Sequence, residues 1–96
     1  MELDNKINEI INYCRQTRKN WTLSSTDNNE VLHVPTQNGM IDVNKYNVLY
    51  YNMTRRDKLL GLSYKSTKYK NVERVACRNG ALLLFKGQEI IAKIKF

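Results

Sequence analysis

The sequence predicts an α+β fold that is mostly β, with an N-terminal helix followed by about seven short antiparallel strands in a bent sheet or small barrel. Three observations lead to this prediction. Apolar residues repeat with a helical period over residues 3–18. From residue 30 onward the period changes to two, the period of a β-strand. The chain has 96 residues, 42% of them hydrophobic, which suits one domain spanning residues 1–96.

The predicted helix, residues 3–18, carries an apolar stripe on one face. The stripe consists of Leu3, Ile7, Ile10, Ile11 and Cys14. Acidic residues lie toward the start of the helix and basic residues toward its end, which suits the helix dipole. Asn20 is expected to terminate the helix. Residues 24–29 are all polar and are expected to form a loop.

The β region is expected to span residues 30–96. Strands are predicted at residues 30–34, 40–43, 46–53, 58–64, 72–77, 81–85 and 90–96. Pro35 is expected to end the first strand because proline has no N–H group for the ladder. Asn-Gly pairs at residues 38–39 and 79–80 predict tight hairpin turns. Residues 54–57 are expected to form a charged turn, and residues 65–71 a polar, basic connection.

The two C-terminal strands have different apolar patterns. Residues 81–85 are nearly all apolar, which is typical of a strand buried on both faces. In the last strand one face is expected to pack and the other to expose its lysines. The packing set is Ile90, Ala92, Ile94 and Phe96, and the alternating set is Ile91, Lys93 and Lys95. An edge strand at residues 88–96 can pair two copies of the chain, so a homodimer is a further possibility.

Composition excludes several classes of protein. No apolar run approaches the roughly 18 residues that a membrane-spanning helix needs. Residues 1–5 are acidic and amphipathic, unlike a secretory signal. Cys14 and Cys77 are expected to be free thiols in a reducing compartment, because a disulfide would require export. His33 is the single histidine, so neither a metal site nor a cofactor is expected. The predicted location is cytoplasmic.

The residues predict a protein without enzymatic activity. Motifs for nucleophilic serine, phosphate-binding and zinc-protease chemistry are missing from the sequence. His33 is interpreted as an ordinary sheet residue. Two alternatives remain open: Asp42 and Asp57 could converge across a sheet, and Cys14 with His33 could form a nucleophile and base. The position of Cys14 on the apolar stripe disfavours its thiolate.

Positive charge is concentrated in the second half of the chain. Residues 1–44 hold four basic and six acidic side chains, and residues 45–96 hold twelve basic and three acidic ones. The net charges are −2 and +9, which sum to the total of +7. A one-sided field of this kind attracts anionic partners. The alternative is a solvated surface that keeps a small protein soluble.

The segment 54–70 is the densest concentration of this charge. Its cations are Arg55, Arg56, Lys58, Lys65, Lys68 and Lys70, against Asp57 alone. Hydroxyls such as that of Ser66 and the rings of Tyr64 and Tyr69 complete a set suited to phosphates, sugars and bases. The arginines suit guanine edges, and the lysines suit phosphates. The sequence therefore predicts nucleic-acid binding, with DNA favoured over RNA.

Three stretches resemble the LytTR family, the mostly-β DNA-binding domains of bacterial response regulators. They are the helix Ile7 to Arg18, the stretch "GMIDVNKYNVLYYNMTRRDKLLGL" and the final "NVERVACRNGALLLFKGQEIIAKIKF". The family's additional helix and its F-x-R-x-H-x-S-Y-x-V-N strand correspond here only to "LSYKSTKYKN", where Tyr64-Lys65-Ser66 is the remnant of the motif.

The resemblance implies DNA binding through three places. The first is the turn around Arg55, Arg56 and Lys58, where Asp57 replaces a histidine common in the family. The second is the loop around Lys65 and Ser66. The third is the C-terminal end at Lys93 and Lys95. Lys93 and Lys95 are selected by the resemblance alone, whereas the other residues also belong to the charged segment 54–70.

The alternative prediction is a protein–protein interaction module or inhibitor, for example a phage or mobile-element protein that binds the acidic surface of a host factor. It depends on the small size of the chain and on tyrosines expected to be exposed, because tyrosine is favoured at interfaces. These tyrosines are Tyr46, Tyr50, Tyr51 and Tyr69.

Overall fold

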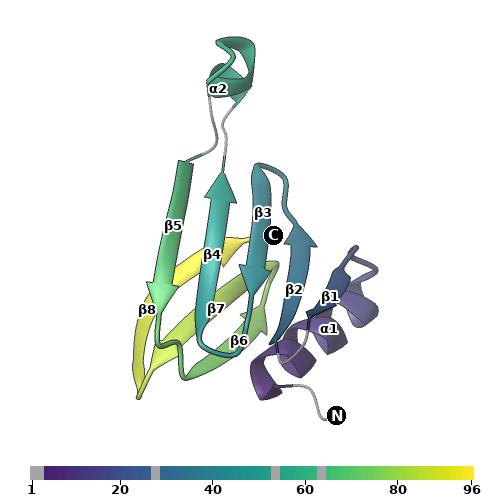
Figure 1. The fold of residues 1–96 in the computed structure, drawn as a ribbon, viewed down its shortest axis with the longest axis vertical. Coiled ribbons are helices and arrows are strands. Elements are labelled where there is room, and N and C mark those ends of the chain that lie inside the picture. Colours follow the sequence, from purple (N-terminus) through teal and green to yellow (C-terminus); the bar gives the residue numbers. More distant parts are fainter. Residues whose placement is uncertain (1–3, 27–28, 53–54, 63–64) are drawn as a thin grey trace.

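The computed structural model of the protein describes residues 4–26, 29–52, 55–62 and 65–96, and contains an N-terminal helix and two antiparallel sheets (Figure 1). In chain order its elements are α1 (Asn5–Thr17), β1 (Thr22–Thr26), β2 (Asn29–Pro35), β3 (Gly39–Val43), β4 (Asn47–Asn52), α2 (Arg55–Leu59), β5 (Lys65–Lys70), β6 (Arg74–Arg78), β7 (Ala81–Lys86) and β8 (Glu89–Lys95). Strands β1 to β5 form one sheet and β6 to β8 the other, each in sequence order. The predicted α+β, mostly-β class is confirmed, as two sheets rather than a closed barrel.

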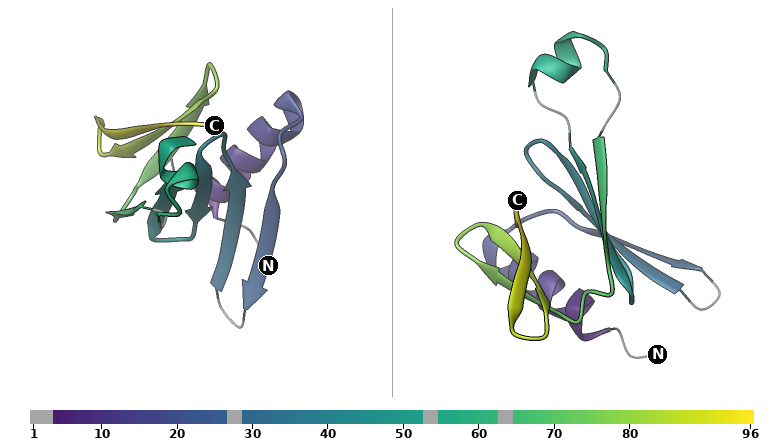
Figure 2. Two further views of the ribbon diagram at one scale, coloured as in Figure 1. Left: turned by 90° about the horizontal axis from the view of Figure 1, so that it is seen from above. Right: turned by 90° about the vertical axis from the view of Figure 1, so that its left-hand side faces the viewer.

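One apolar core holds α1 and the two sheets together. Figure 2 shows the sheets as two layers, with α1 beside the three-stranded one. The helix contributes its stripe of Ile7, Ile10, Ile11 and Cys14. The five-stranded sheet contributes Leu32, Val34, Ile41, Val43 and Val48, and the three-stranded sheet Val75, Leu82, Leu84 and Ile94. Because side chains alternate along a strand, their sequence neighbours point away from the core.

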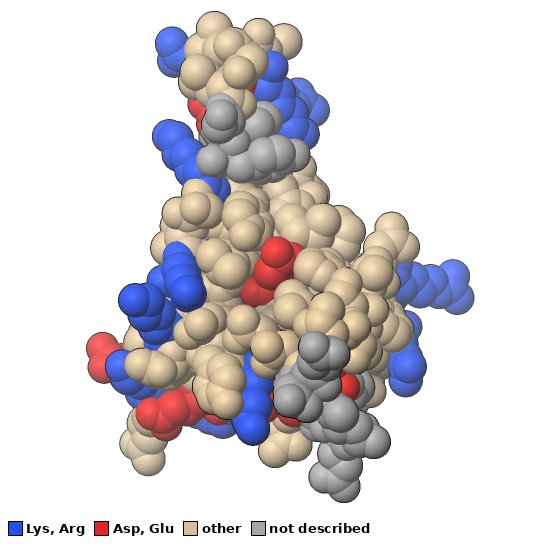
Figure 3. Space-filling model, viewed as in Figure 1, with Lys and Arg blue, Asp and Glu red and all other residues tan. Residues whose placement is uncertain are grey.

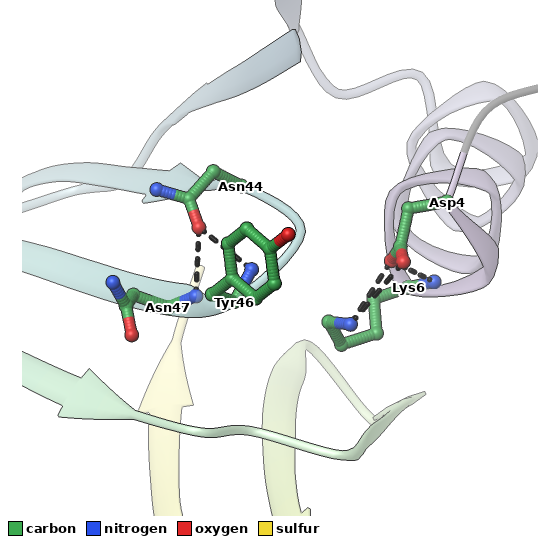
Figure 4. Close-up of polar contacts among 5 residues, drawn as sticks. All are labelled: Asp4, Lys6, Asn44, Tyr46 and Asn47. Atoms are coloured by element: carbon green, nitrogen blue, oxygen red, sulfur yellow. Dashed lines mark hydrogen bonds and ion pairs between the residues drawn. The ribbon is translucent and has the colours of Figure 1, made fainter. Parts of the chain in front are cut away.

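The ends of α1 are fixed by local hydrogen bonds. The Asp4 carboxylate accepts a bond from the Lys6 N–H at 2.9 Å and also forms an ion pair with the Lys6 ammonium (Figure 4). At the other end Arg18 adopts the left-handed conformation, with φ 56°. The Lys19 N–H then donates a hydrogen bond to the Cys14 carbonyl oxygen in the last turn, at 2.9 Å. The predicted helix is confirmed over residues 5–17 and ends at Arg18, before Asn20; Leu3 of the predicted stripe lies outside the described ranges.

Turn chemistry sets the strand register. The Asn44 side-chain oxygen accepts hydrogen bonds from the N–H groups of Tyr46 at 2.8 Å and Asn47 at 2.7 Å, which closes the turn between β3 and β4 (Figure 4). Both hairpins predicted from Asn-Gly pairs are present, but the first turn lies at Gln37 and Asn38, and Gly39 already belongs to β3. At the second of them Asn79 and Gly80 both have positive φ, 51° and 75°, as the tight hairpin turn requires.

The prediction of a loop at residues 24–29 is wrong over residues 24–26 and at Asn29, which begins β2. Residues 24–26 belong to β1, which pairs with β2 from Thr22↔His33 to Thr26↔Asn29; residues 27–28 lie outside the described ranges. Strand β1 lies at the edge of its sheet, where backbone pairing to one neighbour holds it. Leu23 alone in β1 packs against the core, so the period-2 apolar pattern that marks an inner strand is missing.

Three predictions in the charged segment are also wrong. The predicted turn at residues 54–57 and strand at 58–64 are instead the helix α2 and the turn that follows it, with residues 53–54 and 63–64 outside the described ranges. The predicted connection at 65–71 is the strand β5 over residues 65–70. Strand β5 is the other edge of its sheet and tolerates lysines at alternate positions, because one face is in water.

The C-terminal strands differ from their predicted burial. Leu83 and Phe85 are only partly buried, because they point to the outer face of the three-stranded sheet; the prediction of a strand buried on both faces is wrong. An irregularity in the β7–β8 register pairs Phe85 with Ile90 and Leu84 with Ala92. It moves Ile90 outward, where it is 54% exposed, and leaves Ile91 packed against the core.

Substitution of Gly39 by alanine is predicted to disrupt the β3–β4 pair. A Cβ atom at this position would lie 1.8 Å from the Tyr51 carbonyl oxygen, which belongs to the rigid neighbouring backbone. We expect Gly39→Ala to lower the free energy of unfolding by about 3 kcal/mol or more, measured by urea denaturation.

The exposed neighbour Asn38 supplies the control. Asn38→Ala is expected to change stability by less than about 0.5 kcal/mol. Equal stability of Gly39→Ala and the unsubstituted protein would contradict the close approach of the two strands.

Candidate nucleic-acid interface

An arm, defined as the described residues 47–52, 55–62 and 65–70, extends from the core to one end of the molecule. Its two strands pair from Asn47↔Lys70 to Asn52↔Lys65. Between them α2 stands at one end of the longest axis of the molecule, apart from both sheets (Figures 1 and 2). No side chain of α2 is buried. The arm is therefore the edge hairpin of the five-stranded sheet, in which β4 also pairs with β3, with a short helix at its tip.

Local hydrogen bonds hold the end of α2. Gly61 follows the helix with φ +68°, a conformation that glycine adopts without steric cost. The Gly61 N–H donates to the Lys58 carbonyl at 3.2 Å, and the Leu62 N–H donates to the Asp57 carbonyl at 2.9 Å. This pair of bonds is a Schellman motif. The sequence Leu-Leu-Gly could have indicated the helix end, since glycine is enriched at that position.

Six exposed cations lie on this arm, and we refer to them as the arm cations. They are Arg55, Arg56, Lys58, Lys65, Lys68 and Lys70. In Figure 3 basic side chains gather around the tip and along the β5 side of the molecule.

The side chains of β5 alternate between the two faces of the sheet. Tyr69 lies opposite the buried Val48 and packs against the core. Its neighbours Lys68 and Lys70 therefore point to the outer face, together with Ser66. All three are exposed, so the structure brings this part of the predicted site into contact with solvent.

Lys93 and Lys95 lie on a separate surface. Both are exposed and flank the buried Ile94, so they point to the outer face of the three-stranded sheet. Arg74 and Arg78 share that face, and the Arg74 guanidinium lies 4.0 Å from the centroid of the Phe85 ring. The predicted set of basic residues is thus divided between the arm and the back of the other sheet.

Exposure of the tyrosines differs from the prediction. Tyr46 is exposed, but Tyr50 and Tyr69 pack against the core and Tyr51 is half-buried. Tyr64 lies outside the described ranges. The tyrosines therefore form a less extensive contact surface than the sequence predicts.

A hydrogen-bonded array on the outer face of the five-stranded sheet was missed from the sequence. His33 Nδ1 lies 2.7 Å from Asp42 Oδ1, and its Nε2 lies 3.0 Å from the Ser24 hydroxyl oxygen. The three residues come from neighbouring strands, where side chains on one face meet in pairs. The connectivity is that of a serine–histidine–carboxylate relay. Here it links β1, β2 and β3 across an open sheet face.

The two catalytic alternatives from the sequence are not formed. Cys14 is buried in the core beneath the sheet, whereas His33 points to its outer face, so they are no nucleophile–base pair. Asp42 is hydrogen-bonded within the sheet and Asp57 lies in α2 at the tip of the arm. In the described part of the chain, no group of three or more His, Cys, Asp or Glu residues could hold a metal ion.

The two cysteines are free and lie near each other where α1 meets β6. Cys14 is fully buried and Cys77 is partly buried. Burial raises the pKa of Cys77 to about 12, with smaller contributions from Glu9 and Cys14. Burial also raises the pKa of Cys14, against an opposing effect of the Lys19 charge. Cys77 lines an open pocket of about 250 Å³ with polar residues of α1, including Glu9.

Comparisons with protein-family models, curated proteins and solved structures each found no match. The resemblance to LytTR domains stays a prediction. Among the residues that the structure describes, no helix is long and apolar enough to cross a membrane.

Cys77 is predicted to react slowly with iodoacetamide in the folded protein. With a pKa of about 12, its thiolate is scarce at pH 8, and the thiolate is the reactive form. Mass spectrometry should show slow labelling of Cys77 in buffer and rapid labelling in urea, where the pKa returns to its ordinary value. Labelling at equal rates under both conditions would contradict the burial of this thiol against α1.

Proposed function

We propose that this protein binds DNA through the arm cations, as a non-enzymatic, cytoplasmic regulator or accessory factor. The observation that carries the proposal is the exposure of six cations on one ribbon, with Asp57 as the single acid in segment 54–70. Neutralising phosphates with such cations releases counterions, and this supplies most of the affinity in sequence-independent binding.

The spacing of the β5 lysines suits a phosphate backbone. Strand residues rise about 3.3 Å each, so Lys68 and Lys70 are separated by about 7 Å along one side of the strand. That span is about two phosphate repeats of one DNA strand. The outward hydroxyl of Ser66 precedes them on the same face and adds a donor for a phosphate oxygen.

The shape of the arm favours DNA over RNA. The helix α2 projects beyond the sheet at the tip of the arm, and the grooves of B-form DNA admit such a projection. The major groove of A-form RNA is too narrow for side chains to read. At the tip Arg55 and Arg56 have planar guanidinium donors that suit phosphates as well as base edges, while the lysines act as point charges on phosphates.

A protein partner with an acidic surface is the second candidate. The exposed apolar side chains Leu59, Leu60 and Leu62 at the tip of the arm favour it, because apolar side chains surrounded by charge are common at protein interfaces. Salt dependence separates the two candidates, since counterion release from DNA gives a steep linear dependence of log K on log salt.

Removing four arm cations is predicted to weaken DNA binding sharply without unfolding the protein. The variant changes Arg55, Arg56, Lys65 and Lys68 to Gln; all four are exposed. Fluorescence anisotropy with a duplex of about 30 base pairs measures affinity between about 50 and 200 mM salt. With six phosphate contacts we expect a log–log slope of about −5, falling to about −2 in the variant.

A matched control removes the same charge from another part of the surface. It changes Arg78, Lys86, Lys93 and Lys95 to Gln, and these residues are also exposed. The control is expected to retain the slope of about −5 and to lose little affinity. Equal losses in the two variants would show that net charge alone attracts DNA. Salt-independent binding, or no binding to any duplex, would contradict the proposal.

A further inference from the structure

Three leucines at the end of the arm are exposed, and we refer to them as the leucine tip. Leu59 is 87% exposed, Leu60 62% and Leu62 50%. The described residues of the sheets and of α1 lie away from this tip (Figures 1 and 2). Apolar side chains that project together from a small protein commonly mark a contact surface.

The leucine tip has a defined local structure. The Leu60 N–H donates to the Arg56 carbonyl at 3.0 Å, and the Schellman bonds of Gly61 and Leu62 close the turn. The left-handed conformation at Gly61 separates Leu60 from Leu62. The backbone therefore presents these side chains outward through its own hydrogen bonds, independently of the core.

The charges around the leucine tip restrict its partner to an anionic one. Arg55, Arg56 and Lys58 belong to the same short helix, and Lys65 begins the strand that leads back to the sheet. A partner must therefore receive apolar side chains and place negative groups beside them. A DNA duplex does both, because its stacked bases are apolar and its phosphates border each groove. An acidic protein surface, the second candidate above, also does both, but it has no regular row of phosphates for the cations along β5.

The cations behind the tip favour DNA over an anionic membrane. Lys70 lies about 16 Å farther along β5 than Lys65, at about 3.3 Å for each residue. A membrane presents its charge in a plane, and its field falls off within a Debye length of about 8 Å. A duplex that receives the tip has phosphates at several depths, so cations along the arm can reach them.

We propose that the leucine tip is a wedge that enters DNA from the minor groove, unstacks a base step and kinks the duplex. This inference rests on the proposed DNA binding and adds that the bound protein bends the duplex. Proteins that bend DNA from the minor groove use apolar side chains in this way, with nearby cations on the phosphates. The leucines supply the wedge, and the arm cations hold it in place.

The test measures bending and binding separately. A duplex of about 30 base pairs carries a donor and an acceptor dye at its ends and 2-aminopurine at central steps. The unsubstituted protein is expected to raise energy transfer between the ends and to increase 2-aminopurine fluorescence. The double variant Leu59→Ala/Leu60→Ala is expected to lose both signals, while its salt slope is unchanged and its affinity falls by about tenfold or less.

Two further variants act as controls. Leu59→Met/Leu60→Met keeps apolar volume at the tip and should retain the bend. Ile90→Ala removes a half-exposed apolar side chain from the other sheet and should leave both signals unchanged. Circular dichroism should show that each variant folds, since these side chains lie outside the core.

The outcomes distinguish the two proposals. Salt-dependent binding without bending, or bending that survives the alanine variant, overturns the wedge and leaves DNA binding intact. Absence of binding to any duplex overturns both. Vesicles containing phosphatidylserine provide the remaining comparison: leucine-dependent binding to vesicles, with no kink in DNA, would assign the tip to a membrane surface and overturn the wedge.

Discussion

Burial of one apolar face per element is the constraint on which the rest of this structure depends. The stripe of α1 and the inner faces of both sheets share a single core, and that burial is the main favourable contribution to folding. It also decides where the charges lie. Because Tyr69 and Ile94 must point inward, the lysines beside each of them point outward. The two sheets therefore carry their cations on different outer faces, and the second half of the chain does not form one continuous basic patch.

The tip of the arm does not take part in this burial. Strands β4 and β5 contribute Val48 and Tyr69 to the core or its margin, but α2 buries no side chain. A helix of five residues is marginal in water without packing, so local bonds such as those at Gly61 maintain the tip. Regions with few buried contacts open at low free energy. The structure thus combines a packed body with a weakly supported, charged tip, an arrangement suited to contact with a partner.

Strong apolar periodicity predicted the helix and most strands correctly, because these elements bury a face in the core. The failures have a common physical cause. Strand β1 is held at a sheet edge by backbone bonds, and its polar side chains give no signal. In residues 58–64 the leucines predict a strand, although none of the three packs against the core, and Gly61 ends a helix instead. The array of Ser24, His33 and Asp42 depends on cross-strand register, which sequence spacing does not provide.

The same reasoning explains what was predictable at the candidate site. Charge density alone selected the arm cations, and each of them is exposed. It could not separate them from Lys93 and Lys95, because the separation arises from the two-sheet packing. The leucine tip was missed since its residues were assigned to a strand. Whether an apolar side chain is exposed depends on the fold, and the sequence pattern alone does not reveal it.

Mapping of backbone amide chemical shifts by NMR during titration with a duplex tests the central claim most directly. The account predicts that shift changes concentrate in residues 55–62 and 65–70, and that they weaken as salt is raised. Changes concentrated instead around Arg78, Lys93 and Lys95, or spread evenly over both sheets, would contradict the assignment of DNA binding to the arm.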